Sequence, residues 1–415
     1  MKTDVKLHPD HQFDADLLDY AIAQLRRSRT PREPVPRALH LSLPEVLPEL
    51  GMGAQAALRE LSPIALDGAA QLFHPGYFAH MDPATPTVAW AAALWQIAAN
   101  QNLLHPDAAP AARELERRVI DWLKPFFGMA GGHLVPGSTI ANFTALWAAR
   151  EVRGIRRVIA SDRAHLSARK AADILGLEYA AVAAGPDHRM VLDDRTDRAD
   201  VAVVLTAGTV ATGAVDELGV TNAAWVHVDG AWGGPLRFSD RYAALLDGVE
   251  QADSVGFSAH KWCYQPKGTA AVLFRDAEAA HAAMSYGGGY LAVPNVGLLG
   301  SAPANALPFA ATLLAWGRAG LARRIGAGME MARAFADRLR AEPRIQVWGE
   351  PVTGVVVWRP RDVPSTHLRD RLEDAWVSLT DIDGEVWLRC VAANTSADLD
   401  WVMDRIRAAL DAIRS

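Results

Sequence analysis

The chain has 415 residues, of which 50% are hydrophobic and 22% charged, and its formal net charge at pH 7 is −6. This length suffices for two or three domains, and the acidic balance argues against nucleic acid or an anionic membrane surface as the main partner. Two cysteines, Cys263 and Cys390, cannot build a disulfide framework or a thiolate zinc site. We therefore predict a cytoplasmic protein in a reducing compartment, without a metal centre.

Neither a signal peptide nor a membrane span is predicted. Residues Met1–Lys6 lack the apolar core of a signal peptide. The two most apolar windows are Thr87–Ala99, which is short and contains Gln96, and Val201–Val215, which glycines and threonines interrupt. The second window is therefore expected to be buried strand and loop.

The first part of the chain, residues 1–70, is predicted to be an N-terminal helical arm. Asp14–Arg27 has helical periodicity, and three prolines follow between Thr30 and Pro36. Apolar surface without a core of its own has to be covered by another element. We therefore expect this arm to lie across a second subunit.

Residues 71–304 are predicted to form a large α/β domain. Helices are expected at Ala111–Phe127 and Thr139–Arg153. Continuous apolar runs that alternate with helices are typical of a parallel sheet covered on both faces. The runs predicted as strands are Val158–Ser161, Val201–Leu205, Trp225–Val228 and Ser254–Phe257.

Residues 305–415 are predicted to form a smaller α+β domain. A helix is expected at Leu307–Leu339, and a closing helix at Asp398–Ile413. Val352–Trp358 and Glu385–Val391 have the composition of strands.

Polar side chains follow each of the four predicted strands of the large domain. Ligands of an open α/β sheet bind beyond the carboxyl ends of its strands. Taken singly, Asp229 could cap a turn, His165 could be a loop histidine with its hydrogen bonds satisfied, and Lys261 could be an exposed lysine. Because four strand ends carry such residues together, a ligand-binding site is favoured. The segments are Asp162–His165, Thr206–Thr209, Asp229–Trp232 and Ser258–Lys261.

An aspartate and a lysine at such strand ends are the minimal set of groups for holding pyridoxal 5'-phosphate (PLP). The lysine can form a Schiff base with the aldehyde, and the aspartate can keep the pyridine nitrogen protonated, so that the ring withdraws electrons. Asp229 and Lys261 are therefore the first candidates for catalytic residues.

A phosphate site is predicted at the glycine-rich loop Gly131–Thr139, which runs into a helix. Free N–H groups at the helix start and the hydroxyls of Ser138 and Thr139 would hold the phosphate. The alternative is an ordinary helix N-cap. The loop lacks the lysine of a nucleotide P-loop and does not follow a predicted strand, which disfavours a nicotinamide dehydrogenase. The run Gly287–Gly289 is interpreted as a flexible hinge.

Several motifs together resemble one enzyme family. The blocks His227–Gly234 and Ser258–Trp262 and the Gly-Ser-Thr loop are similar to PLP-dependent amino-acid decarboxylases of the group that includes the glutamate, cysteine-sulfinate, diaminobutyrate and aromatic-amino-acid enzymes. His74–Phe78 and Asn100–Asn102 match early motifs of the same family. The resemblance implies PLP fold type I (aspartate aminotransferase-like): a mainly parallel large domain, a small C-terminal domain, and a homodimer with active sites at the interface.

The resemblance also implies roles for residues around the cofactor. Lys261 matches the Schiff-base lysine and Asp229 the partner of the pyridine nitrogen. His165 matches the histidine stacked on one face of the ring, with Ala231 against the other. Further cofactor-binding positions fall on Ser138, Thr139, Thr206, Ser258 and His260.

Two matches point toward decarboxylation. Tyr290 falls where the family has the mobile-loop tyrosine that returns a proton after CO2 leaves, and Arg389 matches the arginine that pairs with the substrate's α-carboxylate. Both roles suit the reaction, which needs an oriented carboxylate and an acid within reach. His80 matches a substrate-facing polar position. The ordinary alternatives are an anchoring tyrosine, a surface arginine and a packed histidine.

We therefore expect a PLP-dependent decarboxylase of an L-amino acid. Trp232 favours an acidic or diamino substrate. The stretch from Tyr290 to Ser301 is short for the family, and Ala302 stands where relatives carry arginine. These departures keep open a PLP-dependent lyase, a β-eliminating enzyme or a decarboxylation-dependent oxidase. A non-catalytic PLP-binding protein is disfavoured because the lysine, aspartate, histidine and tyrosine occur together.

Overall fold

The computed structural model describes residues 13–30, 35, 43–193, 198–219 and 222–414. Residues Met1–Lys6 and most of the proline-rich stretch from Thr30 to Pro36 lie outside the described residues. Among the helices of the described part of the chain, none has the length and apolar character needed to cross a lipid bilayer.

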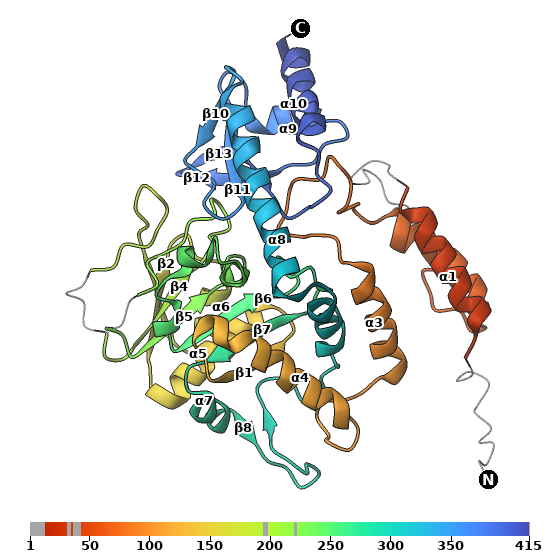
Figure 1. Ribbon diagram of the computed structural model, residues 1–415, viewed down its shortest axis with the longest axis vertical. Helices are drawn as coiled ribbons and strands as arrows, with labels where there is room; N and C mark the ends of the chain where they lie inside the picture. The colour runs from red at the N-terminus through yellow and green to blue at the C-terminus, as the bar shows by residue number, and fades with distance from the viewer. Residues whose placement is uncertain (1–12, 31–34, 36–42, 194–197, 220–221, 415) are drawn as a thin grey trace.

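A seven-stranded sheet forms the centre of the large domain (Figure 1). Its strands are parallel except β7, which runs against both of its neighbours. This arrangement confirms the mainly parallel sheet expected from the apolar runs. In spatial order the strands are β1 (Gly131–Val135), β7 (Ala270–Phe274), β6 (Ser254–Ser258), β5 (Trp225–Asp229), β4 (Val201–Thr206), β2 (Arg157–Ser161) and β3 (Glu178–Val182).

Helices cover both faces of this sheet, which explains why its central strands are apolar at nearly every position. Every residue of β4, β5, β6 and β7 is buried. On one face, over Val204 and Val272, lie α5 (Ser138–Arg153), α6 (Ser167–Leu175) and α7 (Ala277–Ala283). On the other face, over Leu205 and Phe257, lie α4 (Pro110–Leu123) and the first part of α8 (Ala306–Arg340).

The segment Gly131–Val135 was expected to be loop, and that expectation is wrong. It forms β1, antiparallel to β7, with Gly132 opposite Leu273. A Cβ on Gly132 would lie 2.0 Å from the carbonyl oxygen of Val272, so the close approach of two backbones requires glycine there. The glycines that suggested a loop are therefore strand residues, and the loop before α5 does follow a strand. Strands β3 and β7 also went unpredicted.

The C-terminal domain is built on a four-stranded antiparallel sheet. Its spatial order is β10 (Ile345–Trp348), β11 (Val355–Pro360), β13 (Glu385–Val391) and β12 (Ser378–Ile382), with α9 (Ser365–Arg371) and α10 (Leu399–Arg414) beside it. The expected strand Val352–Trp358 begins three residues late, because the chain turns at Gly354, where φ is +78°. Strands β10 and β12 were not predicted.

Helix α8 runs from the large domain into the C-terminal domain (Figure 1). Its helical geometry is interrupted at Gly317, where φ is 59° and ψ 177°. Helix α3 (Thr87–Ala99) packs against α8. The short strands β8 (Ser285–Tyr286) and β9 (Asn295–Val296) form a separate hairpin below the main sheet.

The N-terminal helices lie at the edge of the molecule. Neither α1 (Ala15–Ser28) nor α2 (Ala54–Ser62), which continues into a π-helical turn, contains a buried residue. Phe13, Leu47 and Leu50 are more than 80% exposed. An arm lying across a second subunit would bury these side chains, and the arm at residues 1–70 stays a prediction.

The packing of α8 against Trp262, the residue after Lys261, can be tested at two glycines of the helix. A Cβ on Gly328 would lie 2.7 Å from both the Ala392 carbonyl oxygen and the ring of Trp262, whereas at Gly326 the nearest atom would be 3.9 Å away. We expect Gly328→Ala to lower the melting temperature, because overpacking costs about 1–3 kcal/mol. Gly326→Ala should leave it equal or slightly higher, since alanine favours helix. Equal melting temperatures for the two variants in thermal denaturation would contradict this packing.

Candidate active site

A cavity of about 270 Å³ lies at the carboxyl ends of β4, β5 and β6. A second cavity, of about 510 Å³, lies along β1 and α4; residues 131–136 of the predicted phosphate loop line it, but none of the predicted catalytic, cofactor-binding or substrate-binding residues does. The smaller cavity is the candidate site because the predicted residues gather there. They are Ser138, Thr139, His165, Thr206, Asp229, Ala231, His260 and Lys261.

Asp229 ends β5, and its buried carboxylate accepts two hydrogen bonds. Asn142 Nδ2 donates to Oδ2 at 2.8 Å, and the Ala231 N–H donates to Oδ1 at 3.0 Å. Both donors are neutral. Within the described part of the chain, no lysine, arginine or histidine nitrogen lies within 4.0 Å of this carboxylate. A buried carboxylate with only neutral partners favours a cationic group in the cavity beside it.

Asn142 and His227 support Asp229, and sequence reasoning missed both. The His227 Nε2–H donates to Asn142 Oδ1 at 3.0 Å, and the Ser254 hydroxyl donates to His227 Nδ1 at 2.9 Å. Complete burial lowers the pKa of His227 to about 4, so the ring is neutral. Asn142 lies four residues after Ser138 in the predicted helix, and His227 lies two before Asp229 in its strand. These spacings, which place residues on one face, were the available signals.

The same asparagine connects to His165. Asn142 Nδ2 donates to Ser167 Oγ at 2.9 Å, and the Ser167 hydroxyl donates to His165 Nδ1 at 2.8 Å. Desolvation lowers the pKa of His165, while Asp229 raises it and Lys261 lowers it further. A neutral ring fixed through Nδ1 can lie flat against an aromatic ligand.

Lys261 lines the cavity and is half-buried, three residues beyond the end of β6. Desolvation lowers the pKa of its amine, and the charge of Asp229 opposes this shift. A lowered pKa increases the fraction of neutral amine, which is the form that attacks a carbonyl carbon.

The start of α5 forms the polar end of the cavity. The N-cap residue, Gly137, has φ +106° and no side chain that could cap the helix. The first N–H groups of α5 therefore receive no hydrogen bond from an N-cap side chain. Ser258 Oγ donates to Ser138 Oγ at 2.9 Å, and His260 Nδ1 donates to the Thr269 carbonyl at 3.0 Å. Burial lowers the pKa of His260 to about 4. This end can accept a phosphate.

Thr206 carries an unsatisfied group on the cavity wall. Its hydroxyl is buried and has no hydrogen-bond partner among the described residues. A buried hydroxyl without a partner is costly, and a polar ligand would satisfy it. Together with the carboxylate of Asp229 and the start of α5, this hydroxyl makes the cavity a fitting site for a flat, phosphorylated, cationic ring.

Four predicted residues lie outside this cavity lining: Ser258, whose hydroxyl donates to Ser138 Oγ, and the three residues Arg389, His80 and Tyr290. Arg389 is buried on β13 and donates to the Val210 carbonyl at 2.7 Å and to Ser378 Oγ at 3.1 Å; Val210 itself lines the cavity. His80 is exposed at the rim beside Met81, and its pKa is lowered by desolvation and then by the charge of Arg389. Tyr290 is 75% exposed near His105, and it does not line the cavity of its own chain.

Trp232 is buried and bound to the C-terminal domain. Its Nε1–H donates to the Thr353 carbonyl at 2.7 Å, and its ring lies 4.7 Å from that of Trp262. Its side chain therefore joins the two domains, which weakens its use as a marker of substrate class.

Comparison with known proteins agrees with this geometry. The Pyridoxal-dependent decarboxylase conserved domain matches residues 36–361. The chain belongs to the pyridoxal-dependent decarboxylase family. Its cofactor is PLP, and the residues around the cavity fit that group: Lys261 for the aldehyde, Asp229 for the ring nitrogen, His165 for the ring face and the start of α5 for the phosphate.

Characterised relatives of this decarboxylase act on several amino acids. It is 32% identical to an L-2,4-diaminobutyrate decarboxylase of Rhizobium meliloti (strain 1021), over 88% of this chain and 83% of the relative. It is 30% identical to an aspartate 1-decarboxylase of Aliivibrio fischeri, over 69% of this chain and 63% of the relative. Two solved structures share the fold of this chain, both with a TM-score of 0.82 or above. They are Oryza sativa TDC with PLP and tryptamine and the glutamate decarboxylase domain of a Vibrio parahaemolyticus protein.

These two solved structures cover nearly the whole chain. The Oryza sativa structure has a TM-score of 0.85 and 23% identity, covering 99% of this chain and 98% of its own. The Vibrio parahaemolyticus structure has a TM-score of 0.82 and 22% identity, covering 96% and 95%. At this identity they establish the fold.

The neutral state of His227 makes a prediction for stability against pH. The unfolded chain takes up a proton at His227 below pH 6.5, whereas the folded ring resists protonation down to about pH 4. The unfolded state therefore binds more protons in this window. As the pH is lowered from about 6.5 to about 4, the free energy of unfolding decreases, and His227 accounts for up to about 3 kcal/mol of the decrease. Chemical denaturation at several pH values should show a shallower slope for His227→Gln than for the wild type; equal slopes would exclude this contribution.

Proposed function

We propose that this enzyme decarboxylates an L-amino acid with an acidic or diamino side chain, releasing the amine and CO2. The observation that carries the proposal is that Asp229 and Lys261 line one cavity, with Arg389 hydrogen-bonded to Val210 of the same wall. The substrate class rests on the diaminobutyrate and aspartate decarboxylases among its relatives.

Each residue then has a defined task. Lys261 supplies the amine that binds the cofactor aldehyde, and Asp229 keeps a proton on the ring nitrogen. Bound PLP supplies the electron sink that accepts the bonding electrons when CO2 leaves. His165 covers one face of the ring opposite Ala231, and Asn142 holds both Asp229 and Ser167 in place.

Arg389 orients the carboxylate that leaves. Burial lowers the pKa of its guanidinium, and the hydrogen bonds to Val210 and Ser378 fix its direction at the edge of the cavity. A guanidinium held in this way can bind a carboxylate through two parallel hydrogen bonds. His80, at the same rim, would contact the distal group of the substrate.

Tyr290 would act in the cavity of a second copy of the chain. Its exposure, on the segment between β8 and β9, leaves it free to contact a neighbouring subunit. The exposed apolar side chains of the arm and of α3, including Leu47, Trp95 and Ile97, supply the surface that a homodimer would bury. We therefore propose a homodimer with active sites at its interface. Its proposed location is the cytoplasm.

The second candidate is a PLP-dependent lyase or a decarboxylation-dependent oxidase on the same scaffold. The position of Tyr290 outside its own cavity favours this candidate, since the proton donor would be missing if no second subunit supplied it. Product analysis in heavy water separates the two, because simple decarboxylation leaves one deuterium on the former α-carbon.

Replacement of Lys261 tests the proposed decarboxylation. With a panel of acidic, diamino and aromatic amino acids, we expect the wild type to release equal amounts of CO2 and amine from at least one acidic or diamino substrate. Lys261→Ala should lose activity by at least about a thousandfold, as expected for a covalent catalytic group. Lys267→Ala serves as the control, since Lys267 is exposed and paired with Asp82. Absence of CO2 across the panel would refute the proposal.

Mixing two inactive variants tests whether Tyr290 acts across subunits. A dimer of one Lys261→Ala protomer and one Tyr290→Phe protomer has one site with both groups intact if the tyrosine comes from the partner. Co-expression should then restore part of the activity that each variant lacks alone. If Tyr290 acts in its own chain, no mixed site is intact and activity stays absent.

A further inference from the structure

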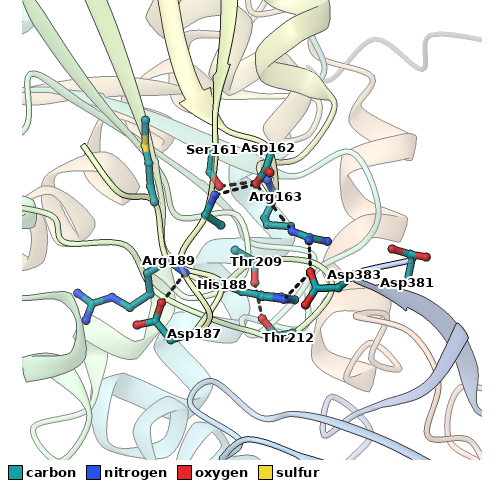
Figure 2. Close-up of polar contacts among 12 residues, drawn as sticks. Ser161, Asp162, Arg163, Asp187, His188, Arg189, Thr209, Thr212, Asp381 and Asp383 are labelled. Atoms are coloured by element: carbon teal, nitrogen blue, oxygen red, sulfur yellow. Dashed lines mark hydrogen bonds and ion pairs between the residues drawn. The ribbon is translucent and has the colours of Figure 1, made fainter. Parts of the chain in front are cut away.

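Outside the cavity, two charged side chains from different domains form an ion pair (Figure 2). Arg163 Nη2 lies 2.6 Å from Asp383 Oδ1. Arg163 belongs to the loop between β2 and α6, and Asp383 to the turn between β12 and β13. The contact therefore joins the large domain to the hairpin of the C-terminal domain.

Both partners are held in place by their own segments. The Arg163 N–H donates to Ser161 Oγ at 3.1 Å, and the neighbouring Asp162 carboxylate accepts the Ala184 N–H at 3.1 Å. Asp383 has φ +54°, a conformation that the hairpin turn imposes. The two charges therefore face each other from short, well-defined turns.

His188 forms the buried side of this contact. Its ring is 2% exposed, lies 4.7 Å from the ring of Trp348, and has its Nε2 3.7 Å from Asp383 Oδ1 (Figure 2). Burial lowers the pKa of His188, the charge of Arg163 lowers it further, and Asp383 raises it. Neither ring nitrogen has a hydrogen-bond partner among the described residues. The carboxylate of Asp383 therefore lies between Arg163 and the buried ring of His188.

The two segments that meet here carry groups of the active site. His165 follows Arg163 by two residues, before α6 begins at Ser167. β13 begins two residues after Asp383 and carries Arg389, which is bound to the large domain at Val210. The Arg163–Asp383 pair and the Arg389–Val210 hydrogen bond therefore attach the β12–β13 hairpin to the large domain at two points.

We propose that the ion pair between Arg163 and Asp383 positions β13 against the β2–α6 loop, so that Arg389 and His165 hold the substrate and cofactor in register. This inference rests on the proposed decarboxylation. The pair is partly exposed, with Asp383 69% accessible, so it contributes little to global stability. Arg163 and Asp383 are positioning residues and do not touch the substrate.

The test is a double-mutant cycle on the holoenzyme at saturating PLP. Arg163→Gln and Asp383→Asn should each raise KM for the accepted amino acid about fivefold, with a smaller change in kcat, and the double variant should be no worse than either single variant. Arg163→Lys, which keeps the charge, should recover most of the wild-type KM. Asp173→Asn breaks an exposed ion pair with Arg169 on α6 and should leave KM unchanged.

Two outcomes would overturn the proposal: a wild-type KM in Asp383→Asn, or fold-changes that multiply in the double variant. Hydrogen exchange supplies a readout that does not depend on turnover. Both single variants should exchange faster in the peptides that cover 161–167 and 381–389, with melting temperatures close to that of the wild type. If the wild type decarboxylates nothing, the proposed function fails, while unchanged exchange in both variants defeats the ion-pair inference by itself.

Discussion

The structure around the site depends on the burial of one carboxylate. Asp229 lies buried at the end of β5, and within the described residues its carboxylate receives hydrogen bonds from the amide of Asn142 and the backbone of Ala231. Removing a carboxylate from water is costly unless a cation accompanies it. Because the neighbouring donors are neutral, the protonated ring of PLP is the group that we propose would complete this site.

Other buried polar groups serve to hold that carboxylate. The Ser254 hydroxyl on β6 fixes the tautomer of His227, and the His227 ring in turn fixes the orientation of the Asn142 amide. The amide nitrogen of Asn142 then donates to both Asp229 and Ser167. Asn142 is the branch point, since its two N–H groups reach the ring-nitrogen side and the His165 side of the cavity. Such networks are stable only when every member is satisfied. Replacement of one member therefore affects both sides of the cofactor.

The C-terminal domain is attached to the large domain beside the cavity through a few long-range contacts. The Thr353 carbonyl accepts from Trp232, the Thr353 hydroxyl donates to the Gly213 carbonyl, and Arg389 donates to Val210. These contacts join segments more than one hundred residues apart. The position of Arg389, the residue proposed to bind the substrate's carboxylate, is therefore set by the domain interface.

The sequence was sufficient to predict which strand-end residues lie together, but not which residues hold them in place. Strand-end residues could be found because parallel strands deliver their carboxyl ends to one edge, which is why Thr206, Asp229 and Lys261 meet. β1 was missed because its glycines permit close backbone contact, a need that only the pairing with β7 reveals. The network through Asn142 and the exposure of Tyr290 depend on tertiary contacts, which periodicity does not encode.

The most direct test of this account is to locate the covalent bond between protein and cofactor. The holoenzyme would be reduced with borohydride, digested and sequenced by mass spectrometry. The account predicts a pyridoxyl group on Lys261 alone, lost when a substrate amino acid is present during reduction. Labelling of Lys267 or of another lysine instead, with Lys261 unmodified, would contradict it.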